Sequence, residues 1–231
     1  MNPSRLNPPD ANPTAPSVPG PTPLALKTVS QTKPSAQPAG GIRSHTGADL
    51  RTIALTQFAS VGFAATSLQN IADIAGFSKS SVLYHFASKE AILEEVLTPA
   101  VDQLERVLNR FVAGPETIGT RQLFVDDFID FLLQFRLELH TFINQAQSLR
   151  GIAIIDRAGV LIVRLAGSIV HDDASNEDRL RFGFALGGAA YSLVAGMTFL
   201  GEASLPDEDL RPALRTVMTE LLAPVSVRAP R

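Results

Sequence analysis

The chain has 231 residues, of which 45% are hydrophobic and 19% are charged, and its formal net charge is −3. This composition is ordinary for a soluble protein that buries an apolar core. The sequence has no cysteine, which excludes disulfide bonds, thiol nucleophiles and cysteine-ligated zinc. Its four histidines form no pair with metal-ligand spacing, so neither a metal site nor a cofactor is expected.

The N-terminal segment, residues 1–45, differs in composition from the rest of the chain. Residues 1–40 hold ten of the sixteen prolines, and residues 1–45 carry four basic side chains against one acidic one. Proline removes backbone donors, and this segment has too few apolar residues to offset the entropy of ordering. We therefore expect a disordered, basic arm.

Helical periodicity begins at Asp49 and predicts four short helices before residue 98. Gly62 is expected to end the first helix. The pair Thr66 and Gln69 has the spacing of a capping box and is expected to open the second. The third is expected to begin at Ser78 and to point three side chains inward, Val82, Leu83 and Phe86; the fourth is expected to be capped by Ser88.

Beyond Pro99, which is expected to kink or restart the fourth helix, every periodic segment again has helical spacing. The predicted segments are 121–139, 140–149, a shorter pair within 152–170, 177–200 and 207–222, with a polar loop at 171–176. The expected fold is all-α. An N-terminal three-helix helix-turn-helix bundle, residues 46–97, is joined to a larger C-terminal helical bundle, residues 98–225.

Two short helices separated by a tight glycine turn, with a third packed across them, form a helix-turn-helix. Ala72 and Ala75 keep the second helix slim, and Gly76 can adopt the left-handed conformation of the turn. The third helix can then present its N-terminal end to the major groove of DNA.

Residues 49–97 carry a more specific pattern. It reads Phe58-x3-Gly62-x3-Thr66-Ser67-Leu68-x2-Ile71-Ala72-x2-Ala75-Gly76-Phe77-Ser78-Lys79, then Val82-Leu83-Tyr84-His85-Phe86-x-Ser88-Lys89-Glu90. This pattern strongly resembles the DNA-binding domain of TetR-family regulators. It departs from the family at Ser80, where glycine or proline is common, and at Leu83, where an aromatic residue is usual and is here displaced to Tyr84.

The resemblance implies a set of DNA-contacting residues. Lys79, Ser80 and Ser81, at the start of the third helix, would face base edges or phosphates. Tyr84 and His85 would lie near the DNA backbone. Thr66 and Ser67 at the N-terminus of the second helix, and Lys89 at the start of the fourth, would hold phosphates. These residues are Thr66, Ser67, Lys79, Ser80, Ser81, Tyr84, His85 and Lys89. Alternative interpretations stay open: the serines and Thr66 as helix caps alone, Tyr84 in the small core, His85 as a neutral surface residue, the lysines as solvated charges, and the basic arm as a solubility device.

The resemblance also implies a small-molecule pocket and a homodimer contact in the C-terminal bundle. The candidate ligand-binding residues are Phe128, Phe131, Phe135, Phe142, Gln145 and Tyr191. For each phenylalanine, an ordinary place in the core is the competing interpretation. The apolar stretch 182–201 also allows a membrane-span interpretation, but its glycines and flanking charges favour burial in the bundle and against a second subunit, together with the final helix.

The sequence thus predicts a cytoplasmic, nucleoid-associated bacterial repressor, not an enzyme. Its expected partners are a double-stranded DNA operator, an unidentified small-molecule effector and a second copy of the chain, with no membrane. Enzyme motifs such as a nucleophile elbow or a phosphate loop are missing from the sequence. Two alternatives remain: a DNA-binding activator or architectural factor, and a ligand-binding helical protein whose DNA-reading domain has decayed.

Overall fold

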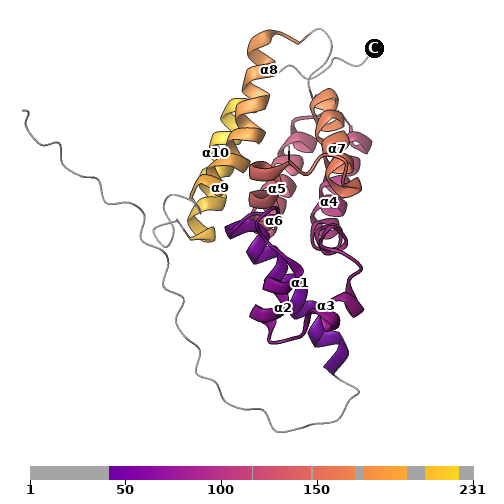
Figure 1. Cartoon of the computed structure of the whole chain (residues 1–231). Coiled ribbons are helices and arrows are strands. Elements are labelled where there is room, and N and C mark those ends of the chain that lie inside the picture. Colours follow the sequence, from indigo (N-terminus) through magenta and orange to yellow (C-terminus); the bar gives the residue numbers. More distant parts are fainter. Residues whose placement is uncertain (1–41, 116, 147, 170–173, 197–205, 224–231) are drawn as a thin grey trace, which may run out of the picture. The chain divides into compact units, whose positions relative to one another are not determined.

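The computed structural model describes residues 42–115, 117–146, 148–169, 174–196 and 206–223, and all regular structure within these ranges is helical (Figure 1). The elements are α1 (Ile42–Ser60), α2 (Leu68–Ala75), α3 (Lys79–His85), α4 (Lys89–Ala113), α5 (Ile118–Gln134), α6 (Arg136–Gln145), α7 (Ala153–Ile169), α8 (Asn176–Gly183), the π-helical segment η1 (Phe184–Gly188), α9 (Ala189–Ala195) and α10 (Asp207–Leu222). The predicted all-α fold is confirmed. Most of the expected arm lies outside the described residues.

The helix-turn-helix forms where the sequence predicts it, because its local signals agree with its packing. α1, α2 and α3 enclose a small core in which Phe58, Ile71 and Val82 are fully buried. Gly76 follows α2 in the left-handed conformation, with φ of 72°, and its backbone N–H bonds to the last turn of α2. Ser78 then caps α3 by accepting a hydrogen bond from the backbone N–H of Ser81.

Three details of this region differ from the prediction. α1 begins at Ile42, seven residues before Asp49, because no proline interrupts the chain there. The cap of α2 is Ser67, which accepts from the Asn70 backbone N–H, so the predicted capping box at Thr66 is wrong by one residue. Leu83 does not point inward: 44% of its surface is exposed, whereas Val82 and Phe86 are buried.

α4 is one continuous helix that contacts α1 at its start and packs against α5, α6 and α7 further along. Pro99 lies inside it on the exposed side and does not restart it. A proline removes one helical hydrogen bond, but the bonds of the flanking turns hold the helix together. The predicted domain boundary at residues 97 and 98 therefore falls within a single helix.

Other element boundaries are set by packing. The predicted break after residue 139 lies instead at Phe135, whose ψ of 40° is not helical and whose side chain is buried. The expected pair of helices within 152–170 is the single helix α7. Within 176–195 the predicted long helix is continuous but contains η1, and its expected end lies outside the described residues.

The C-terminal helices pack side by side. α10 contacts α5, α8 and η1, and Figure 1 shows α10 running alongside the continuous helix formed by α8, η1 and α9. Arginines on α6 and α10 form ion pairs across this packing: Arg215–Asp126 at 2.9 Å, Arg211–Asp130 and Arg136–Asp207. Asp127 pairs with Arg110 of α4 at 2.7 Å. The acidic residues Asp126, Asp127 and Asp130 of α5 are thus a set of ion-pair acceptors. Among the described residues, no helix is long and apolar enough to cross a membrane.

Candidate nucleic-acid interface and ligand cavity

The outward face of α3 combines short polar and large side chains. Lys79, Ser80, Leu83 and Tyr84 are exposed, and Tyr84 keeps 74% of its surface accessible. Tyr84 is therefore not part of the small core, which removes that alternative. Its ring meets the half-buried His85 ring edge to face, with centroids 5.4 Å apart. The exposed Leu83 was missed as a candidate contact because the periodicity of so short a helix does not define its inner face.

Three serine hydroxyls lie together at the start of α3. The Ser78 Oγ lies 2.8 Å from both the Ser80 Oγ and the Ser81 Oγ while it also caps the helix. Each hydroxyl can donate one bond and accept others. Ser80 and Ser81 thus retain hydrogen-bonding capacity for a partner in front of α3, with their positions fixed by Ser78.

Thr66 and Ser67, both expected near a phosphate, differ in their placement. The Thr66 side chain is buried, and its hydroxyl donates to the Gly62 carbonyl at 2.8 Å. The structure therefore gives Thr66 a structural role, because a buried, bonded hydroxyl does not reach a phosphate. Ser67 is exposed at the N-terminus of α2, where the helix dipole and free backbone N–H groups favour an anion.

Lys89 is also engaged within the protein. Its ammonium donates to the carbonyls of Phe63 at 2.6 Å and Thr66 at 2.8 Å, and it lies 4.1 Å from the centroid of the Phe63 ring. Two of its three donors and its contact with the ring thus tie the start of α4 to the loop between α1 and α2. This placement argues against the predicted phosphate contact.

Gln145, predicted to bind a ligand, instead joins α6 to the helix-turn-helix. Its Nε2 donates to the carbonyl of Phe58 at 2.7 Å, and its Oε1 accepts from the backbone N–H of Phe63. The Gln145 side chain does not line the cavity described next. Its hydrogen bonds are with residues 87 and 82 positions earlier, so no local pattern could have revealed them.

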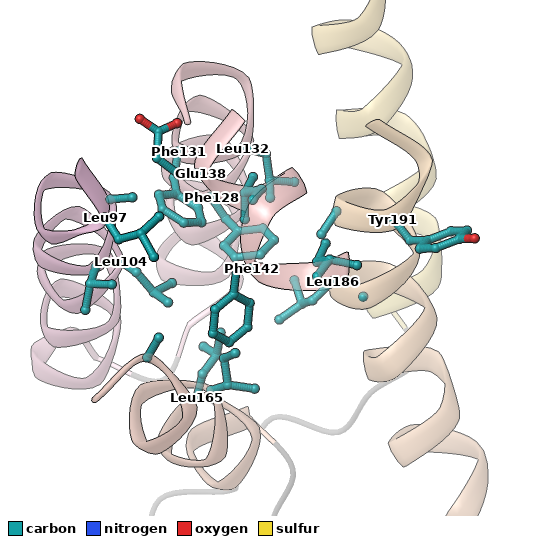
Figure 2. A pocket seen from close by; sticks show the side chains of 18 of the residues that line it. Leu97, Leu104, Phe128, Phe131, Leu132, Glu138, Phe142, Leu165, Leu186 and Tyr191 are labelled. Atoms are coloured by element: carbon teal, nitrogen blue, oxygen red, sulfur yellow. The ribbon is translucent and has the colours of Figure 1, made fainter. Parts of the chain in front are cut away.

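A cavity of about 460 Å³ lies within the C-terminal bundle, in the size range of small-molecule sites. Side chains from α4, α5, α6, α7, α8, η1 and α9 line it (Figure 2). Four of the predicted ligand-binding residues are in the wall, namely Phe128, Phe131, Phe142 and Tyr191. Phe135 is not: it is buried in the core beside Phe131, with ring centroids 5.7 Å apart.

Glu138 is the one acidic residue among the described residues that line the cavity. Burial raises the pKa of its carboxyl above the ordinary value. The sequence held a signal for it, since Glu138 precedes Phe142 by four residues and therefore shares its helix face. Burial also lowers the pKa of the nearby His140, which favours its neutral form.

A helix-turn-helix with an exposed polar reading helix, joined to a helical bundle with an apolar cavity, defines the class of helix-turn-helix regulators. Residues 51–96 match the model of the family described as "Bacterial regulatory proteins, tetR family". Residues 51–96 therefore form a DNA-binding domain of the TetR family, as the sequence pattern predicts.

Two regulators that are similar to part of the chain support this classification. The HTH-type transcriptional repressor KstR2 of Rhodococcus jostii is 40% identical over 83 residues, which are 36% of this chain and 40% of that protein. The regulator RutR of Escherichia coli K12 is 47% identical over 49 residues, which are 21% of this chain and 23% of RutR. The aligned part thus spans less than half of these relatives. They are regulators rather than enzymes, in agreement with the prediction.

Solved structures extend the similarity to most of the fold. KstR2 of Mycobacterium tuberculosis has a TM-score of 0.58 at 18% identity, covering 82% of this chain and 99% of that one. The MbdR regulator of Azoarcus sp. CIB has a TM-score of 0.59 at 18% identity, covering 80% of this chain and all of that one. These similarities establish a shared fold.

The contacts of Lys89 predict that it stabilises the fold. Replacing it in Lys89→Met leaves the Phe63 and Thr66 carbonyls without their donor, which we expect to lower the free energy of unfolding by about 1–3 kcal/mol. The matched variant Lys79→Met, on the exposed face of α3, should change it by less than about 0.5 kcal/mol. Urea unfolding followed by circular dichroism measures both, and equal stabilities of the two variants would contradict the assignment.

Proposed function

We propose that the chain is a homodimeric transcriptional repressor that binds a pseudo-palindromic DNA operator through α3 and responds to a small molecule bound in the C-terminal cavity. The observation that carries the proposal is the exposed face of α3. Short hydroxyl side chains, a lysine and a tyrosine are presented there by a rigid glycine turn. Such side chains suit the edges of bases and the phosphates of the major groove.

The charge distribution within the helix-turn-helix supports DNA binding, although residues 46–97 carry five acidic side chains against three basic ones. α3 itself carries Lys79 and no acidic residue. Of the acids nearby, Glu95 on α4 is neutralised by Arg51 at 2.8 Å, and Asp73 on α2 accepts a hydrogen bond from Gln69. The acidic side chains therefore lie on neighbouring helices, so that a phosphate in front of α3 meets a cation first.

An exposed apolar face on the C-terminal helices supports the homodimer. Leu180, Phe184, Tyr191 and Val217 of α8, η1, α9 and α10 are more than half exposed. Two such faces related by a twofold axis would place the two α3 helices in successive major grooves, about 34–36 Å apart.

Two elements could transmit ligand binding to α3. α4 lines the cavity with Leu97 and Leu104 and begins with Lys89 at the helix-turn-helix. α6 lines it with Phe142 and ends at Gln145, which holds the Phe58 and Phe63 backbone. A displacement of either helix by a ligand would move the loop that precedes α2. A coupling of about 1–3 kcal/mol would change operator affinity 5- to 150-fold.

Repression, rather than activation, is proposed because the relative KstR2 is named a repressor. The position of the binding site relative to the promoter tests this directly. A site that overlaps the promoter supports repression, whereas a site upstream of it would support an activator.

We expect sequence-selective DNA binding that weakens with salt and requires the exposed face of α3. Lys79→Ala should lower the affinity and reduce the salt slope by about one unit, because one phosphate contact is lost. Tyr84→Ala should also weaken binding. Gel-shift titration at two salt concentrations, on the upstream DNA and on sequences selected from a random pool, measures these effects.

The control for these variants is Arg164→Ala, which removes an exposed cation on α7, outside the helix-turn-helix. It should leave DNA binding unchanged. If random-pool selection recovers no preferred sequence, DNA reading is refuted and the decayed-domain alternative is favoured. Equal losses in Lys79→Ala and Arg164→Ala would show non-specific attraction instead.

The dimer face predicts the oligomeric state. Phe184→Glu places a charge on the proposed contact, and we expect it to convert the dimer to a monomer in sedimentation velocity, because an unpaired buried charge is costly. Val163→Glu is the matched control, since Val163 is 72% exposed on α7 and Phe184 is 64% exposed on η1. A wild-type monomer, or dissociation by the Val163 variant alone, would place the contact elsewhere.

The hydrogen bonds of Gln145 predict how the two bundles are coupled. Gln145→Leu removes both of them, so we expect the Phe63 amide to exchange with solvent about tenfold faster, equivalent to about 1.4 kcal/mol. Hydrogen exchange on peptides covering residues 58–70 measures this. Asn144→Leu is the control, because the Asn144 side chain contacts His140 on the same helix. Equal exchange rates of the Phe63 amide in the two variants would show that Gln145 does not couple the two bundles.

A further inference from the structure

The walls of the C-terminal cavity restrict the chemistry of what can enter it. Among its described lining residues, only Glu138 and Tyr191 have polar side chains, and none is lysine, arginine or histidine. Figure 2 shows the Tyr191 hydroxyl directed away from the cavity and the Glu138 carboxyl group at its edge, near Phe131. The interior is therefore apolar, and its one charged wall residue is an acid.

A carboxylate or phosphate inside such a cavity would lose its hydration without gaining a cationic partner. Burying an unpaired charge is strongly unfavourable, and Glu138 would add electrostatic repulsion. Neighbouring arginines are engaged elsewhere. Arg136 of α6 pairs with Asp207, and Arg157 of α7 pairs with Asp102 and Glu105. Among the described residues, no lysine, arginine or histidine lines the cavity to receive an anionic ligand.

A ligand group that donates hydrogen bonds or carries a positive charge would instead find favourable partners in the cavity wall. Glu138 can accept hydrogen bonds, and the aromatic rings of Phe128, Phe131 and Phe142 in the same wall present faces that attract a cation. The charge-assisted bond between an amine and a carboxylate is also stronger than that between neutral groups.

Given the proposed function, in which this cavity is the effector site, we infer that its ligand is an apolar molecule whose single polar group is an amine or a hydroxyl held by Glu138. Carboxylates and phosphates are excluded. The hydrocarbon part occupies the space between α4, α6 and α7, where the small residues Ala100, Ala158 and Ala166 leave room. Glu138 is then the residue that determines the specificity of the site.

Three probes of equal chain length test the inference: decylamine, 1-decanol and decanoate. Each is titrated calorimetrically into the full chain at neutral pH without DNA, below the concentration at which it forms micelles. We expect decylamine to bind most tightly, decanol next, and decanoate at least about tenfold more weakly than decylamine, as one charge-assisted bond implies.

Two variants test whether binding depends on the Glu138 carboxylate and on the cavity itself. Glu138→Gln keeps the shape of the side chain and should reduce the affinity for decylamine about tenfold while leaving that for decanol within about threefold. Ala158→Leu fills the cavity and should abolish binding of all three probes. Thermal melting checks that both variants are folded.

Three outcomes overturn the inference. The first is that decanoate binds the wild-type chain as tightly as decylamine does, and the second is that Glu138→Gln leaves the order of the three affinities unchanged. The third is that no probe binds the wild-type chain more tightly than it binds Ala158→Leu. These outcomes are independent of DNA binding, which is tested separately. If decylamine binds as expected but leaves the affinity for the selected DNA unchanged, the ligand class stands and the effector role proposed above fails.

Discussion

The ammonium of Lys89 is the interaction on which the arrangement of the reading helix depends. It donates to two backbone carbonyls of the loop between α1 and α2 and lies over the Phe63 ring. That loop determines where α2 begins, and the turn at Gly76 then determines where α3 points. Gln145 of α6 also bonds to this loop at the Phe63 amide, and to the Phe58 carbonyl of α1. The short loop between α1 and α2 is thus held by α4 and α6 together, and both helices also line the cavity.

The larger bundle combines firm packing with an internal space. Aromatic rings pack in succession from Phe111 through Phe124 and Phe128 to Phe135, and ion pairs between arginines and α5 acids hold α10 in place. The space opens where small residues face one another, and a core filled with larger side chains would close it. One acid at the edge of an otherwise apolar wall gives this space its selectivity.

The predicted site residues divide according to the range of their contacts. Exposure of Lys79, Ser80 and Tyr84 follows from their place on one short helix, and the wall positions of Phe128, Phe131 and Phe142 follow from helical spacing. Thr66, Lys89 and Gln145 were assigned differently because each carries hydrogen-bonding groups that look available in the sequence. Lys89 and Gln145 bond to carbonyls and an amide 23 to 87 residues away, which no local pattern reveals, whereas Thr66 bonds to the Gly62 carbonyl four residues before it.

The sequence by itself determined the all-α class, the helix-turn-helix with its glycine turn and serine caps, the family, and the bounds of α10, because these depend on residues within a few positions of one another. Only the tertiary structure decided the break at Phe135, the continuity of α4 through Pro99 and the engagement of Lys89 and Gln145. It also decided that Glu138 borders the cavity. These features depend on which surfaces meet across the fold, and burial, not local preference, determines that outcome.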